Sequence, residues 1–144
     1  MPAAKLAKKK GAAATKAAKK DLAPVFAALR EILEPFRGRL AVQAETAGNY
    51  HLEARSILHR GKPLYFAGVR TGKNYVSFYL MSVYSSPETL EKMSPRLRQR
   101  MQGKACFNFT TVDPDCFAEL GKLAEEGLKR FSTPEFKQMI QRMQ

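Results

Sequence analysis

The 144-residue sequence lacks tryptophan and holds only two cysteines, Cys106 and Cys116. Two cysteines cannot form the disulfide framework of a small secreted domain, and no spacing of Cys and His resembles a zinc site. No apolar run approaches the roughly 20 residues that a membrane helix needs. No apolar signal segment follows the basic start. We therefore expect a cytoplasmic protein with no membrane partner, no metal and no cofactor.

Acidic residues are absent from the first 20 positions, which hold eight alanines and seven lysines. This tail, residues 1–20, therefore has a charge of +7. The rest of the chain holds 18 basic and 13 acidic residues, so +5 of the total +12 belongs to it. Repelling ammonium groups with few bulky apolar side chains leave little surface to bury. We predict a disordered tail over 1–20 and a single domain over 21–144.

The basic tail has two interpretations that stay open. It can be a nucleic-acid arm, whose lysines release counterions from phosphates without reading sequence. It can equally be a solubilising or merely tolerated extension. An organellar presequence fits less well, because the tail contains no Arg or Ser. As a nucleic-acid arm, its candidate phosphate contacts are Lys8, Lys9, Lys10, Lys16, Lys19 and Lys20.

Apolar periodicity after the tail predicts a helix followed by a sheet. Steps of three and four from Leu22 to Phe36 indicate an amphipathic helix, with Asp21 as its cap and Gly38 near its end. Four strand-like segments follow, at residues 40–46, 51–58, 64–70 and 74–81. Because the turns between them are short, we predict an antiparallel meander.

The second half of the chain predicts a helical link, a fifth strand and two closing helices. Ser86-Pro87 and Ser94-Pro95 indicate short helices at about 87–93 and 95–101, with Gly103 ending the second. Residues 105–111 read as a strand, and Asp113-Pro114 and Thr133-Pro134 begin the last helices. The order predicts an α+β fold: an antiparallel sheet of about five strands with N- and C-terminal helices packed on one face.

The histidines, His51 and His59, are the candidate bases. No Ser flanked by Gly at a strand–turn–helix accompanies them. Gly103-Lys104 precedes a strand, which is the wrong order for a phosphate loop. A regular strand would place His51 on a polar, solvent-facing side. The predicted alternation sets Leu52, Ala54, Ser56 and Leu58 against His51, Glu53, Arg55 and Ile57.

The cysteines and acid pairs also predict structural roles. Cys116 falls in the first turn of a helix, but Asp113 and Asp115 beside it favour the neutral thiol. Cys106 lies in a strand, where small buried cysteines are common. Asp113 and Asp115 suit helix capping, and no acid pair makes a convincing metal cage. We therefore expect a protein that is not an enzyme.

Basic residues gather in the helical link and in the hairpin before it. Arginine forks suit phosphate, and Arg96 and Arg100 would share one side of a helix. In the hairpin, aromatic side chains alternate with basic ones, a pattern that can stack nucleic-acid bases on a sheet. The alternative is that Tyr75 and Tyr79 pack under a helix while the arginines are solvated. The candidate polyanion contacts are Arg70, Lys73, Lys92, Arg96, Arg98, Arg100 and Lys104.

The hairpin from Phe66 to Tyr79 resembles the core hairpin of the YdhG-like domain family, a group of largely uncharacterised bacterial proteins. That family often shows a Lys-Asn turn and then an aliphatic–small–aromatic–Tyr strand, and after a helical link a Gly-Lys strand and a closing helix. The matching positions are Lys73, Asn74, Val76, Ser77, Phe78, Tyr79, Gly103, Lys104, Phe107 and the helix from Pro114.

This resemblance implies a frataxin-like α+β sandwich and iron handling or delivery as one family role. Glu31 and Glu34 on the first helix would be the residues to test for iron. The +5 charge of the domain opposes cation binding, so we rank this role last. We expect a non-enzymatic binding or accessory module of unknown ligand, with nucleic-acid association through the tail and the Arg/Lys patch as the first alternative.

Overall fold

The computed structural model of the protein describes residues 21–84 and 86–142. The tail at 1–20, its lysines and the disorder predicted for it lie outside these residues. Within the described part of the chain, every helix is too short or too polar to cross a bilayer. The helices are α1 (Ala23–Leu33), the 3-10 turn η1 (Glu34–Phe36), α2 (Met81–Tyr84), α3 (Pro87–Lys92), α4 (Pro95–Arg98), α5 (Pro114–Phe131) and α6 (Pro134–Arg142).

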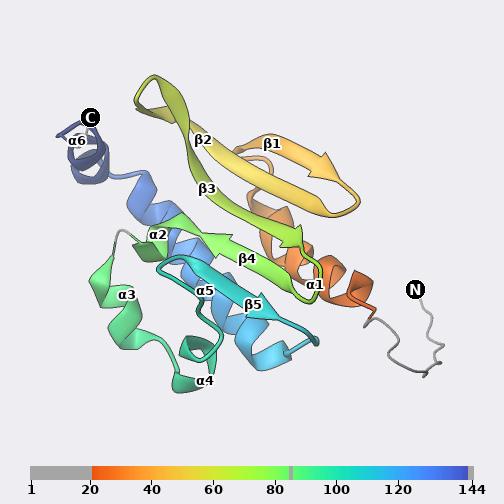
Figure 1. Ribbon diagram of the computed structural model, residues 1–144. Helices are drawn as coiled ribbons and strands as arrows, with labels where there is room; N and C mark the ends of the chain where they lie inside the picture. The colour runs from red at the N-terminus through yellow and green to blue at the C-terminus, as the bar shows by residue number, and fades with distance from the viewer. Residues whose placement is uncertain (1–20, 85, 143–144) are drawn as a thin grey trace.

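The strands form one antiparallel sheet in the order β1-β2-β3-β4-β5 (Figure 1). The predicted α+β class, with an antiparallel meander and helices on one face, is confirmed. Arg60 and Gly61 both have positive φ, 55° and 78°, as the two-residue turn between β2 and β3 requires. The strands are β1 (Ala41–Thr46), β2 (Asn49–His59), β3 (Lys62–Thr71), β4 (Val76–Leu80) and β5 (Cys106–Phe109).

The core lies between the sheet and the helices α1 and α5, which Figure 1 shows behind the strands. Val76, Phe78 and Leu80 alternate along β4 and are fully buried on this side. Phe131 at the end of α5 meets β3 edge to face through Phe66, at 5.2 Å between ring centroids. It also stacks on Phe136 of α6, at 4.2 Å. The closing helices are therefore joined to the sheet through aromatic packing.

Helix boundaries follow the proline and capping residues in most places. Asp113 accepts from the backbone N–H of Cys116, and Ser94 accepts from that of Leu97, so both predicted caps are confirmed. Ser86 makes no side-chain cap, so that prediction is wrong. The first helix ends at Leu33 because Pro35 cannot donate the next helical hydrogen bond, and a 3-10 turn follows. The short helix α2 directly after β4 was not predicted.

The far half of β2 departs from the regular alternation expected for it. The register with β3 shifts between Ala54 and Leu58. Ile57 is consequently buried at 4% exposure, whereas Leu58 is 51% exposed. The prediction that Leu58 shares the core side with Leu52 and Ala54 is therefore wrong, because the bulge reverses the alternation.

The segment between α4 and β5 lies along the outer edge of β5. The N–H of Asn108 donates to the carbonyl of Arg100, and the N–H of Gln102 donates to the carbonyl of Cys106. Met101 forms an isolated bridge with Phe107. Gly103 adopts φ +87°, which a non-glycine residue rarely does, and this lets the chain reverse into β5.

Candidate functional site

One face of the sheet has no described helix in front of it (Figure 1). The register pairs His51 with Gly68, Gly68 with Tyr79, and Tyr79 with Cys106, so these four residues cross the sheet in one row. Their neighbours along each strand are buried on the helix side, so this row faces the open side. We call this surface the open face. Other residues on it are Asn49, Tyr65, Arg70, Ser77 and Asn108.

Tyr65 reaches the open face because of a bulge in β3. The register pairs Leu52 with Ala67 and then Glu53 with Tyr65, which leaves Phe66 as an extra residue. Phe66 and Ala67 are consequently both fully buried on the helix side. Strict alternation from Gly68 would have placed Tyr65 in the core, so the bulge is what turns its ring outward.

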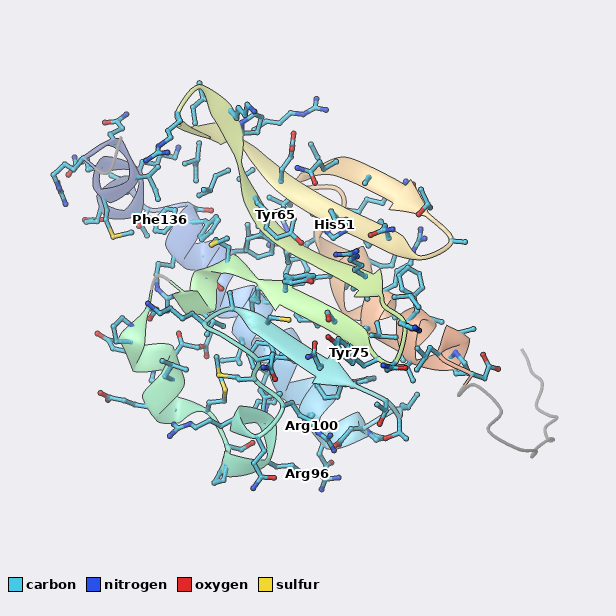
Figure 2. The ribbon with its side chains drawn as sticks, in the orientation of Figure 1. His51, Tyr65, Tyr75, Arg96, Arg100 and Phe136 are labelled. Carbon is cyan, nitrogen blue, oxygen red and sulfur yellow. The ribbon has the colours of Figure 1, made fainter. Side chains whose placement is uncertain are left out.

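His51 and Tyr65 meet over Gly68, and Figure 2 shows their two labelled side chains close together. The Nδ1 atom of His51 lies 2.7 Å from the Tyr65 hydroxyl oxygen. A Cβ atom on residue 68 would lie 2.0 Å from His51 Nδ1 and 2.1 Å from the Tyr65 hydroxyl. Only glycine leaves room for this pair, and the two rings in turn cover the bare backbone.

Both members of the pair are held uncharged at neutral pH. Burial, followed by the positive charge of Arg70, lowers the pKa of His51. Burial also raises the pKa of Tyr65, with Tyr79 adding to the shift. Nε2 of His51 lies 3.3 Å from Oδ1 of Asn49. These contacts fit a neutral ring in which Nε2–H donates to Asn49 and Nδ1 accepts from Tyr65.

A second set of polar contacts occupies the β4–β5 end of the open face. The Ser77 hydroxyl donates to Oδ1 of Asn108 at 2.6 Å, and the Cys106 thiol lies 3.4 Å from the same oxygen. Burial raises the pKa of Cys106, although hydrogen bonds from Ser77 and Tyr79 oppose the shift. The thiol is therefore neutral at pH 7 and is a weak nucleophile.

Two hollows lie side by side on the open face. The larger, of about 550 Å³, is lined by Gln43, Asn49, His51, Tyr65, Arg70 and Tyr79. The smaller, of about 220 Å³, is lined by Arg70, Gly72, Lys73, Asn74, Tyr75, Ser77 and Tyr79. They share the lining residues Arg70 and Tyr79, so they are adjacent, and we call the two hollows together the depression. Neither hollow has an acidic residue in its lining.

The residues at the rim of this depression are accessible. Tyr75 is 41% exposed, and Arg70 and Lys73 are exposed. Among the described residues, no carboxylate lies within salt-bridge distance of either cation. The structure therefore brings together the predicted Arg70, Lys73, Tyr75 and Tyr79. The alternative in which a helix covers the two tyrosines is not what the described chain shows.

The predicted basic patch of the helical link is not assembled in the same way. Helix α4 ends at Arg98, so Arg100 lies beyond it and the prediction that Arg96 and Arg100 share a helix side is wrong. Arg96 is 3.1 Å from Oδ2 of Asp113, and Arg98 donates to the carbonyl of Leu90. The Arg100 guanidinium lies 5.9 Å from the Phe109 ring centroid. Figure 2 shows Arg96 and Arg100 away from His51 and Tyr65.

Two further cations of the predicted patch flank these arginines. Lys92 is exposed at the end of α3, and Lys104 is exposed in the loop before β5. Neither lines the two hollows. Of the polyanion contacts predicted in the domain, Arg70 and Lys73 are therefore the two that the open face brings together.

The other candidate groups have partners that hold them in structural roles. Burial, then the hydrogen bond and charge of Asp113, raises the pKa of Cys116 to about 11, as expected for a neutral thiol. Glu34 pairs with Arg30 at 2.9 Å. His51 contacts Tyr65 and Asn49, while its predicted neighbour Glu53 lies 3.9 Å from Arg55. Over residues 21–84 and 86–142, no three His, Cys, Asp or Glu side chains come together as metal ligands.

Sequence reasoning missed Tyr65, Asn49 and Gly68 as members of this site. Gly68 in the middle of a strand was the available signal, because an isolated strand glycine often marks a close approach of side chains or backbone. The open face was therefore recognised only from the structure.

Comparison with known proteins finds no relative: no protein-family model, no curated protein and no solved structure matches the chain.

Proposed function

We propose that this protein is a non-enzymatic binding module that holds single-stranded nucleic acid on the open face of its sheet. The observation that supports this most is the depression on the uncovered side of an antiparallel sheet, where Arg70 and Tyr79 line both hollows. Exposed aromatic rings on a sheet stack unpaired bases, and cations beside them contact the phosphates.

The charges of the depression favour an anionic partner. Arg70 and Lys73 have no carboxylate near them in the described chain, so their charge is available to phosphates. Tyr75 offers an exposed ring beside them. A single strand suits this surface better than a duplex, because stacking on tyrosine needs bases that are not already stacked in a helix.

The chemistry of the face supports binding more than catalysis. His51 is hydrogen-bonded on both ring nitrogens to an uncharged hydroxyl and an amide. A nucleophile needs an adjacent base that can take its proton. The Cys106 thiol contacts Asn108 instead, and its pKa is raised by burial.

The first experiment is fluorescence anisotropy of the full-length protein with labelled single-stranded DNA and RNA of about ten nucleotides. Binding should be saturable at low salt and weaker for a duplex of the same length. Tyr75→Ala should weaken binding by about five- to a hundredfold, the range for one stacked base. Lys122→Gln with Lys129→Gln, on the exposed side of α5, is the control that changes charge away from the face. No binding at low salt would overturn the proposal.

The basic tail can be tested in the same assay. Seven contacting lysines would contribute a slope of roughly −5 to the log–log salt dependence on a single strand, at about −0.7 per contact. Removing residues 1–20 should reduce the slope by that amount and leave the effect of Tyr75→Ala intact. A slope unchanged by the truncation would assign the tail to its other interpretation, a solubilising extension.

We also infer that the chain is a divergent YdhG-like protein with a frataxin-like α+β fold. We infer that it comes from a bacterium and is located in the cytoplasm. In support, Lys73 and Asn74 lie in the β3–β4 loop, Phe78 is buried and Tyr79 lies on the open face. Two free thiols suit a reducing compartment. Iron handling has no comparable support. Calorimetry with ferrous iron would test it, and binding that weakens in Glu31→Gln with Glu34→Gln would bring that role forward.

A further inference from the structure

A second row of residues crosses the open face, and all of its members are polar. The register pairs Asn49 with Arg70, Arg70 with Ser77, and Ser77 with Asn108, so these side chains follow one another from β2 to β5 on the same side. Arg70 belongs to β3, the third strand of the sheet. It therefore lies under the middle of an oligonucleotide bound across the face, whereas Lys73 lies in the loop at the end of the hairpin.

Tyr79 lies diagonally across from Arg70. It pairs with Gly68, two residues before Arg70 on the same strand, and diagonal neighbours of this kind are within reach of long and aromatic side chains. Tyr79 is half-buried, so part of its ring is accessible. A base stacked on that ring would present one edge to the Arg70 guanidinium.

The polar groups around this position are mainly hydrogen-bond donors. Arg70 has donors only, and it forms no ion pair within the described chain. The hydrogen bond from Tyr65 to Nδ1 of His51 leaves the ring proton on Nε2, which donates to the Asn49 carbonyl oxygen. The N–H groups of the Asn49 amide are therefore left for a ligand. Gln43 is the other amide in the lining of the larger hollow, which contains no acid.

The bases differ in how they fit a site of this kind. Guanine carries two adjacent acceptors, O6 and N7, on one edge, and an arginine fork can bind both. Adenine places its N6 amino group beside N7, and cytosine places its N4 amino group on the corresponding edge, so each sets a donor against the guanidinium. Thymine offers only O4 as an acceptor there. Guanine is therefore the base that a donor-rich site fits best.

We propose that the larger hollow selects guanine, which stacks on Tyr79 while O6 and N7 accept hydrogen bonds from the Arg70 guanidinium. Asn49, directly opposite Arg70 on β2, adds a donor to the same edge of the base. Lys73 contacts the phosphates and does not distinguish the bases. This inference rests on the proposed single-strand function, because it assigns a base preference to the same face.

The test uses the anisotropy assay, with full-length protein and thymidine strands of about ten nucleotides that carry one variable base at the centre. Guanine should bind about five- to 150-fold more tightly than adenine, the range for one bidentate contact. Inosine keeps O6 and N7 and should bind as guanine does, whereas 7-deazaguanine lacks N7 and should bind at least about fivefold more weakly.

The outcomes separate this inference from the proposed function. Binding with no preference for guanine, a preference for cytosine, or equal binding of guanine and 7-deazaguanine would overturn the base assignment and leave single-strand binding in place. No binding of any strand at low salt would overturn both.

Variants distinguish reading of the base from attraction to the phosphates. Arg70→Lys keeps the charge but lacks the planar fork, so the preference for guanine over adenine should fall at least about fivefold, while a strand of thymidine alone should bind nearly as before. Lys73→Gln is the matched control, and it should weaken all strands alike and keep the preference. Circular dichroism checks that each variant is folded. An Arg70→Lys protein that still prefers guanine, or a Lys73→Gln protein that loses the preference, would contradict the inference.

Discussion

The β3–β4 hairpin and the helical link around α4 both gather arginines and lysines, but they use them differently. In the hairpin, Arg70 and Lys73 line a depression that contains no acid. In the link, Arg96 is 3.1 Å from Asp113, the residue that caps α5. A cluster of cations in a sequence therefore does not say how much charge a surface offers. Nearby acids also set the available charge. A carboxylate that caps a helix can pair with a cation packed against that helix end, as Asp113 does with Arg96.

The largest expected effect is on the stability of the protein, through Gly68 in the strand that leads into the hairpin. Gly68→Ala should destabilise the protein by about 1–3 kcal/mol, as overpacking does, since its Cβ would overlap His51 and Tyr65. Chemical denaturation measures this. Gly38→Ala is the control, because its Cβ meets no atom within 4 Å, and it should change stability by less than about 1 kcal/mol. Equal effects of the two substitutions would show that His51 and Tyr65 do not meet over residue 68.

The next effect compares the two basic clusters directly. Arg70→Gln with Lys73→Gln should weaken binding of a single-stranded oligonucleotide by about tenfold at low salt. Arg96→Gln with Arg98→Gln removes the same charge from the link and should have less than about a twofold effect, since these side chains are already engaged. Anisotropy at matched ionic strength measures both. If the two double variants lose affinity equally, the contrast between the clusters is wrong.

A smaller effect follows from the cap that neutralises Arg96. Asp113→Ala should cost about 1 kcal/mol, the usual value for a lost helix cap. Burial opposes ionisation of Asp113, but hydrogen bonds from Cys116 and Arg96 outweigh it and lower its pKa. Its contribution is therefore present above the unfolded-state pKa of about 3.8 and is lost as pH falls through the lower folded value. Urea titrations at several acidic pH values, compared with the Asp113→Ala protein, measure this loss.

The smallest effect concerns His51. Its pKa is lowered by burial and then by Arg70, so the unfolded chain takes up a proton at higher pH than the folded one. The contribution of His51 to stability should be full above its unfolded-state pKa of about 6.5 and should be lost as pH falls through the lower folded pKa. The measurement is the urea midpoint at pH 7.5 and 5.5 in the native protein and in His51→Gln. The variant should show a smaller decrease, and an identical decrease would assign the titration to another group.

The fold could be predicted from local signals, but the site only in part. Apolar spacing and the capping residues Asp113, Ser94 and Thr133 located the main elements. Arg70, Lys73, Tyr75 and Tyr79 were found because they lie close together on one hairpin. Tyr65 was missed because one bulge reverses its side of the sheet. Such a bulge depends on how two strands pair, and alternation within one strand does not contain that information.

The hydrogen bonds along the outer side of β5 also matter for the protein in solution. A sheet edge with free backbone groups is a template on which a second copy can add a strand, and this is a common start of aggregation. Here the residues around Arg100 and Gln102 already satisfy backbone groups of Asn108 and Cys106. The segment after α4 therefore shields an edge that a four-residue strand would otherwise leave open to self-association.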